Sequence, residues 1–147
     1  MGLGRIVLLA VLLLAGASDA FAACSVTATG MLFGPYNVFD LTPVDSTATI
    51  ALKCATKDKN IKITLDRGGN STFNRVMDSG ANHLNYNLYL DATRSNIWGD
   101  GTAGTVAYLD SNPANGTVSI PVYGRIPAGQ DVSVGAYTDS ILVTVHF

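Results

Sequence analysis

Apolar and polar residues alternate along most of this chain after its first two dozen residues. Because successive side chains of a strand point to opposite faces, strict alternation predicts half-buried β-strands over residues 47–54, 60–66, 84–91 and 117–123. A first strand is expected near residues 25–33. Pro121 lacks a backbone donor and predicts an edge or a bulge in its strand. The residues expected to face inward are Ile50, Leu52, Cys54, Ile61, Ile63, Leu65, Leu84, Tyr86, Leu88, Leu90, Val118, Ile120 and Val122.

The last eleven residues, 137–147, alternate in the same way. One face carries Ile141, Val143, Val145 and Phe147, and the sequence stops there with no turn and no partner strand. Such a strand predicts an open sheet edge that accepts a strand from another polypeptide. Assembly, rather than catalysis, is therefore the first functional hypothesis.

The spacing of strands and turns also indicates the fold class. Segments rich in turn residues separate the strands, and no segment after the N-terminal region has an apolar period of 3.6 residues. We therefore expect an all-β protein, a β-sandwich of immunoglobulin-like topology. A single domain is predicted over residues 23–147, a length that one hydrophobic core can serve.

The N-terminal residues have the pattern of a signal peptide, predicted over residues 1–22. Arg5 supplies the positive region, residues 6–15 are almost all apolar, and Ala20-Phe21-Ala22 is a small-x-small cleavage site. The apolar run is shorter than the about 20 residues of a membrane-spanning helix. The mature chain is thus expected to begin near Ala23, to be exported, and to lack a membrane span.

Two cysteines remain after this cleavage, Cys24 and Cys54. In an oxidising compartment an even pair predicts a disulfide, which would lie in the core because Cys54 shares the apolar face of its strand. The alternative is a lipoprotein cleavage box, residues 21–24, with Cys24 acylated, although that would leave Cys54 as a lone thiol. No CxxC spacing is present, so no metal site is expected.

Charge and motifs give no sign of catalysis. The net charge is −2 and no Lys/Arg cluster is present, so no nucleic-acid partner is expected. The sequence has no GxSxG elbow, and neither His83 nor His146 has an evident carboxylate partner. We therefore predict no catalytic residues, no cofactor and no enzymatic activity.

One loop offers a possible ligand contact. Trp98 could stack on a sugar and Asp100 could hold an ion, although Gly-Asp-Gly is usually only a tight turn. With Tyr89 and Tyr123, which we expect to be exposed, Trp98 supports a second hypothesis, a secreted carbohydrate-binding module.

Several motifs, in this order and spacing, are similar to those of a known family. They are Cys24-Ser25-Val26, Phe33-Gly34-Pro35-Tyr36, Cys54, Leu84-Asn85-Tyr86-Asn87-Leu88-Tyr89 with Asp91, Trp98-Gly99-Asp100-Gly101, Tyr123-Gly124-Arg125-Ile126-Pro127 and Gly135-Ala136-Tyr137-Thr138-Asp139-Ser140. Together they resemble the spore coat protein U domain, over essentially the whole mature chain. The family includes spore coat protein U and the subunits of archaic, Csu-type chaperone-usher pili.

This resemblance implies an incomplete, pilin-like immunoglobulin sandwich that lacks its final strand. It also implies a periplasmic chaperone that lends a strand, an outer-membrane usher where that strand is exchanged, and neighbouring pilus or coat subunits. The missing strand would lie beside residues 141–147, in a groove between the last strand and the first. The expected function is a surface structural subunit with a role in adhesion or biofilm formation.

The sequence departs from the family in one respect. Polymerising members carry an alternating apolar donor segment before the first cysteine, whereas here only Ala23 lies between the predicted cleavage site and Cys24. We therefore expect a subunit that accepts a strand but donates none. That favours a terminal position or a non-polymerising spore or cyst coat protein, although tip subunits of the family usually carry two such domains.

Overall fold

The computed structural model describes residues 24–54 and 59–146. The predicted signal peptide, Ala23 and Phe147 lie outside the described residues. Within them the chain is all-β, as predicted. Its strands are β1 (Ser25–Ala28), β2 (Val44–Cys54), β3 (Ile61–Leu65), β4 (Arg75–Ser79), β5 (Asn82–Tyr89), β6 (Tyr108–Asp110), β7 (Gly116–Ile126) and β8 (Val143–His146).

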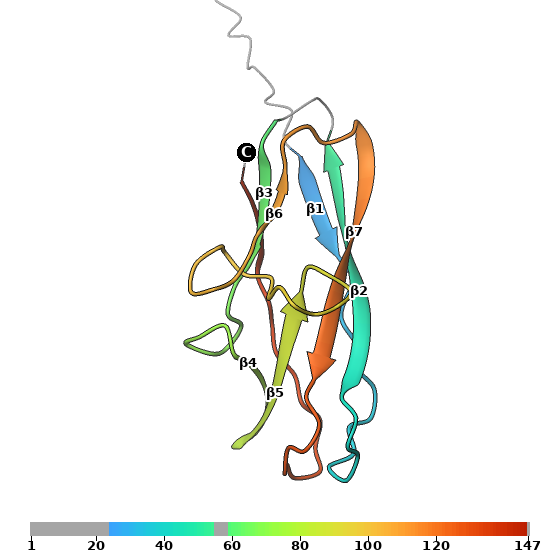
Figure 1. The fold of residues 1–147 in the computed structure, drawn as a ribbon, viewed down its shortest axis with the longest axis vertical. Coiled ribbons are helices and arrows are strands. Elements are labelled where there is room, and N and C mark those ends of the chain that lie inside the picture. The colour runs from blue at the N-terminus through green and yellow to red at the C-terminus, as the bar shows by residue number, and fades with distance from the viewer. Residues whose placement is uncertain (1–23, 55–58, 147) are drawn as a thin grey trace, which may run out of the picture.

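The strands form two sheets that pack as a sandwich (Figure 1). One sheet has the order β1-β2-β7-β5-β4, and the other has the order β6-β3-β8. All pairs within them are antiparallel. The loops from β1 to β2 and from β7 to β8 hang at one end, and the C-terminal end of β8 lies toward the other (Figure 1). We call the end with these two loops the loop end.

The core lies between the sheets and contains the residues that alternation selected. Ile50 and Leu52 of β2 belong to the same core cluster as Ile61 and Ile63 of β3, and all four are almost completely buried. Leu84, Tyr86 and Leu88 of β5 and Ile120 and Val122 of β7 are buried too, which confirms the predicted inward faces. Burial of this apolar surface is the main force that holds the two sheets together.

Four strands match the predicted segments closely, while the ends of the chain differ. The first strand stops at Ala28, and the last begins only at Val143, because residues 137–142 bridge to β4 through Thr138 and Asp78 instead of extending β8. β7 is interior rather than an edge strand. The described ladder between β7 and β5 nevertheless covers only residues 123–125 of β7, so Pro121 is paired with β2 alone. Because β5 has no partner at this position, the absent N–H of Pro121 removes no hydrogen bond between β7 and β5.

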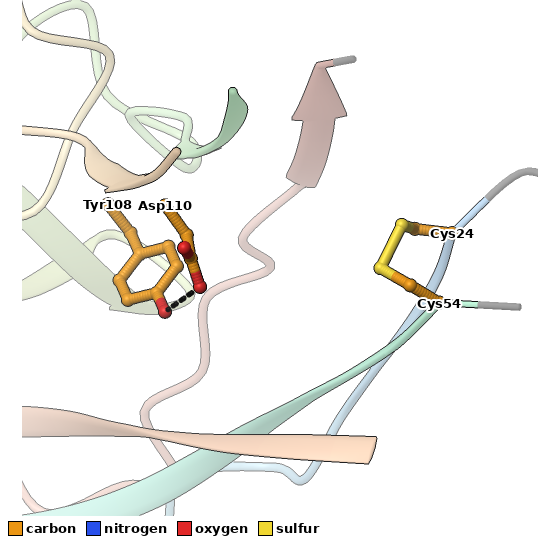
Figure 2. Close-up of a disulfide and its surroundings, with 4 residues drawn as sticks. All are labelled: Cys24, Cys54, Tyr108 and Asp110. Atoms are coloured by element: carbon orange, nitrogen blue, oxygen red, sulfur yellow. Dashed lines mark hydrogen bonds between the residues drawn. A yellow bond between two sulfur atoms is a disulfide. The ribbon is translucent and has the colours of Figure 1, made fainter. Parts of the chain in front are cut away.

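The predicted disulfide is present. Cys24 and Cys54 are bonded, with a sequence separation of 30 residues, and both are buried (Figure 2). Cys24 immediately precedes β1 and Cys54 ends β2, and these strands are neighbours, with Ser25 opposite Lys53. The bond therefore links the edge strand β1 covalently to the sheet. In the chain-entropy model, closing a loop of this length stabilises the folded state by roughly 3 to 4 kcal/mol.

Candidate functional site

The free edge of β8 is the first feature of the candidate site. Of the described strands, β8 pairs with β3 alone, with Val145 opposite Ile63 and Val143 opposite Leu65. A constant-type immunoglobulin sandwich has strands A, B, E and D in one sheet and C, F and G in the other. Here β1, β2, β7 and β5 follow the order A, B, E, D, and β3 and β8 occupy positions C and F. Among the described residues, no strand occupies position G beside β8.

An apolar groove opens beside this edge. The groove has a volume of about 290 Å³ and lies between the segment that follows β1 and the segment that leads into β8. Its floor is the core itself, because Ile50, Leu65, Leu88 and Val122 from both sheets reach it. Its other lining residues are Ala28, Thr29, Gly30, Met31, Phe33, Ala48, Met77, Tyr86, Asp139, Ile141 and Val143.

The structure separates the four residues predicted to form the acceptor edge. Ile141 and Val143 line the groove, whereas Val145 is half-buried in β8 and lies outside the lining. Phe147 lies outside the described residues. Leu142, between the two lining residues, is 64% exposed, as alternation requires. The groove therefore lies beside the start of β8, toward the loop end.

Asp139 and Tyr86 give this groove one polar end. The Tyr86 hydroxyl donates to Asp139 Oδ2 at 2.7 Å, and Oδ1 accepts from the backbone N–H groups of Gly69 at 2.9 Å and Ser140 at 2.8 Å. Burial, followed by the hydrogen bond to Asp139, raises the pKa of Tyr86 well above its usual 10.0. The sequence marked Tyr86 only as an inward residue, because nothing in the pattern joins it to a carboxylate far along the chain.

The raised pKa of Tyr86 predicts a loss of stability at high pH. Above pH 10 the unfolded chain releases the phenol proton while the folded chain keeps it, so the free energy of unfolding should fall by up to about 1.4 kcal/mol per pH unit. Urea unfolding of the full chain from pH 7 to 11 measures this decline. Tyr86→Phe should be less stable at pH 7 but decline less steeply, and equal slopes would contradict the assignment.

A buried cation lies behind this end of the groove. Arg75 is 0% exposed; its Nε and Nη2 donate to the carbonyl of Asp66 at 3.0 and 2.6 Å, and Nη2 also donates to the carbonyl of Trp98 at 2.7 Å. Nη1 donates to Asn87 Oδ1 at 2.9 Å, and the guanidinium lies 5.5 Å from the ring centre of Phe73. Burial lowers the pKa of Arg75, although an arginine stays protonated at physiological pH.

The ligand contact suggested for Trp98 is wrong. The side chain is 0% exposed, packs against Tyr108 and donates its indole N–H to the carbonyl of Ile63 at 3.0 Å. A fully buried ring cannot stack on a sugar. The Oδ1 atom of Asp100 accepts from the backbone and the hydroxyl of Thr102 at 2.8 and 2.6 Å, the geometry of an ordinary turn. Its ligand contact stays a prediction.

Other candidate chemistry is sparse in the described part of the chain. His83, for which the sequence shows no evident carboxylate partner, belongs to β5 and contacts Asp78 Oδ1 through Nδ1 at 2.6 Å across the β4–β5 hairpin. His146 is exposed and contacts the Thr64 hydroxyl. Among residues 24–54 and 59–146, no three His, Cys, Asp or Glu side chains gather as metal ligands. No helix within those residues could cross a bilayer.

Large apolar side chains project from the loop end. Phe39 and Leu41 in the loop from β1 to β2 are 86% and 93% exposed, and Val134 in the loop from β7 to β8 is 106% exposed. Leu32, in the first of these loops, is 85% exposed. The loops are joined by Tyr36, whose hydroxyl donates to the carbonyl of Pro127 at 3.2 Å. We call these four exposed side chains the loop-end patch.

In the described part of the chain, an immunoglobulin-like sandwich has an apolar groove beside the unpaired edge of β8, and this combination defines a pilin-like structural domain. The sequence matches the Spore Coat Protein U domain over residues 10–144, and the chain belongs to this family. Proteins of this family are structural rather than enzymatic, and this membership supports the prediction of no enzymatic activity that the sequence motifs gave.

The chain is also similar to individual proteins. The chain is 33% identical over 69 residues, 47% of its length, to Protein U of Myxococcus xanthus. Its fold resembles one chain of the CsuC–CsuE chaperone–tip adhesion subunit pre-assembly complex from archaic chaperone-usher Csu pili of Acinetobacter baumannii, with a TM-score of 0.61, 20% identity and coverage of 85% of this chain. The E. coli Hda pilus minor tip subunit, HdaB, gives a TM-score of 0.46, with 13% identity, 82% coverage of this chain and 79% of HdaB.

The match covers only part of the first two relatives. It spans 37% of Protein U and 39% of the Csu complex chain. Similarity to the Csu chain therefore concerns the fold of one domain.

Proposed function

We propose that this chain is an exported structural subunit of a chaperone-usher type pilus or surface coat, and that it is completed by a strand from another polypeptide. The observation that carries the proposal is the apolar groove beside the unpaired edge of β8. A donated strand would pair with the backbone of β8 and insert alternate apolar side chains among the residues of the core. Donor-strand complementation of this kind shields the exposed part of the core from water and pairs the free backbone groups of the β8 edge.

The partners follow from this mode of assembly. A periplasmic chaperone lends the first strand, an outer-membrane usher is the place of exchange, and neighbouring pilus or coat subunits supply the final strand. The chain passes through the periplasm and then resides at the cell surface. Family membership and the fold shared with a chain of a Csu chaperone–subunit complex support these partners.

The test is co-expression of the full chain in a bacterial periplasm with and without a chaperone of this family. We expect the chain to accumulate only with the chaperone and to co-purify with it. Val143→Asp places a carboxylate in the groove and should abolish the complex, whereas Leu142→Asp, one residue away on the exposed face, should not. A chain that folds alone, with a sharp melt unaffected by the chaperone, would overturn the proposal.

A second form of the protein tests strand donation without a substitution that could prevent folding. In this form, which we call the donor-complemented form, a flexible linker and a strand with apolar residues at alternate positions are added after residue 147. This form should accumulate without any chaperone and melt at a higher temperature than the unextended chain. An extension with the same composition but no alternation is the matched control and should have no effect.

We further propose that the subunit adheres through the loop-end patch, in keeping with a role in adhesion or biofilm formation. Fully exposed large apolar side chains on a rigid sandwich favour contact with apolar surfaces. The donor-complemented form should bind polystyrene, and the double variant Phe39→Ser, Leu41→Ser should lose most of that binding. Leu109→Ser, a change of an exposed residue on β6, should retain it, and equal retention by both variants would contradict the proposal.

A non-polymerising spore or cyst coat protein is the alternative role for the same fold. The match to Protein U supports it. It predicts complementation by a single partner without growth of a fibre, which electron microscopy of the assembled material distinguishes.

A further inference from the structure

Among the described residues, the groove contains a single carboxylate. Asp139 is the one acidic residue of that described lining, which is otherwise apolar apart from Thr29 and the hydroxyl of Tyr86. It is half-buried. Within residues 24–54 and 59–146, its Oδ1 accepts two backbone N–H groups and its Oδ2 accepts the Tyr86 hydroxyl alone. Because each carboxylate oxygen can accept two hydrogen bonds, Oδ2 retains acceptor capacity.

The charge of Asp139 has no cationic partner at the groove. No Lys, Arg or His in the described part of the chain forms an ion pair with it. Arg75 lies near enough to influence this region but is fully buried and donates to Asp66, Asn87 and Trp98. Asp66, a second nearby acid, adds negative charge. A strand that covered this end of the groove with an apolar side chain would therefore desolvate a carboxylate that has hydrogen bonds but no cation in contact with it.

The position of Asp139 relative to the apolar lining is set by the backbone. Asp139, Ile141 and Val143 are spaced by two residues and all line the groove. A strand laid beside them also places every second side chain inward. In a donated strand that continues past β8 along residues 139–142, the inward residue opposite Asp139 is therefore two positions from the one opposite Ile141, whichever way that strand runs.

We propose that the groove selects a donated strand that carries a basic side chain opposite Asp139 and apolar side chains at the next two inward positions. The proposal rests on the proposed strand-acceptor function and names the chemistry of the partner strand. The motif is apolar-x-apolar-x-basic, or its reverse for the opposite strand direction. An ammonium or guanidinium group there pairs with the carboxylate of Asp139, while the apolar residues fill the space beside Ile141 and Val143.

Asp139 also has a structural role, which the test must separate. It holds the approach to β8 against the loop from β3 to β4, and a Cβ on Gly68, at φ +63°, would lie only 2.1 Å from Asp139 Oδ2. Substitution of Asp139 alone therefore cannot distinguish the selection of a basic residue in the donated strand from the structural role of Asp139. Variation of the donated strand leaves these internal contacts intact.

The experiment uses the donor-complemented form and scans lysine through the inward positions of the appended strand. Urea unfolding should show one position, two residues from the one opposite Ile141, where lysine raises the folding equilibrium constant roughly tenfold over methionine. Lysine at the adjacent outward position is the matched control and should have no such effect. With Asp139→Asn the lysine advantage at that position should disappear, because the charge is lost and the shape is kept.

The outcomes are separable. If no appended strand stabilises the chain, the strand-acceptor function itself fails. The second outcome is that alternating strands stabilise the chain, but methionine stabilises the form with Asp139 at least as much as lysine does at every inward position of the appended strand. In that case only the selection of a basic residue is overturned. That comparison does not depend on whether Asp139→Asn folds.

Discussion

Arg75→Ala is expected to lower the free energy of unfolding of the donor-complemented form by about 3 to 5 kcal/mol. The change removes a fully buried side chain, which leaves a cavity, and it deprives the carbonyls of Asp66 and Trp98 of the Arg75 donors. The amide oxygen of Asn87 loses one of two donors and keeps the backbone N–H of Leu88. Unpaired acceptors in a dry core cost more than the bonds contributed when they were made. Urea unfolding followed by circular dichroism measures the loss.

Two further variants divide this loss between volume and hydrogen bonding. Arg75→Met keeps most of the side-chain volume but none of the donors, so it should remain strongly destabilised. Arg75→Lys keeps the charge but replaces a planar fork with a single ammonium group, which cannot reach acceptors from three directions, and it should recover only a minor part of the stability. A methionine variant as stable as wild type would show that packing, and not the hydrogen bonds, is what Arg75 provides.

Arg75 also shows where prediction from the sequence stops. β4 was not predicted, because its residues, Arg75–Ser79, do not read as an alternating apolar segment. In the fold, Arg75 and Met77 are its buried positions, and a charged residue takes an inward place because three oxygens from distant segments converge on it. No local pattern records such a convergence. β6 escaped for a simpler reason, since three residues are too few to show a period.

The candidate site was predictable to a greater extent. Alternation in the last segment placed Ile141 and Val143 on one face, and both line the groove. What the sequence could not supply is the register, which puts Val145 opposite Ile63 and outside the groove. Nor could it supply the polar end, because Asp139 meets Tyr86 across 53 residues of sequence. Pairing between strands distant in sequence determines both features.

Trp98→Ala is the second change with a large expected effect, about 3 to 5 kcal/mol of stability. Trp98 looked like a surface aromatic because it stands beside a Gly-Asp-Gly turn. The glycine at position 99 is needed for packing rather than for an exposed turn, because a Cβ on Gly99 would lie 2.4 Å from Thr105 Oγ1 and 2.7 Å from Phe73 Cε1. The turn is thus packed against the body of the sandwich, and the indole enters the core, where it supports β3 through the carbonyl of Ile63.

The loss of Trp98 should also affect the groove, because β3 is the strand that pairs with β8. Trp98→Phe keeps an aromatic ring but loses the indole N–H, leaving the Ile63 carbonyl without that donor, and it should cost clearly less than the alanine change. Both variants should weaken chaperone capture in proportion to their loss of stability, since neither residue touches the donated strand. Full stability of Trp98→Ala in urea unfolding would mean that the indole lies outside the core, and it would restore Trp98 as a candidate for contact with a sugar.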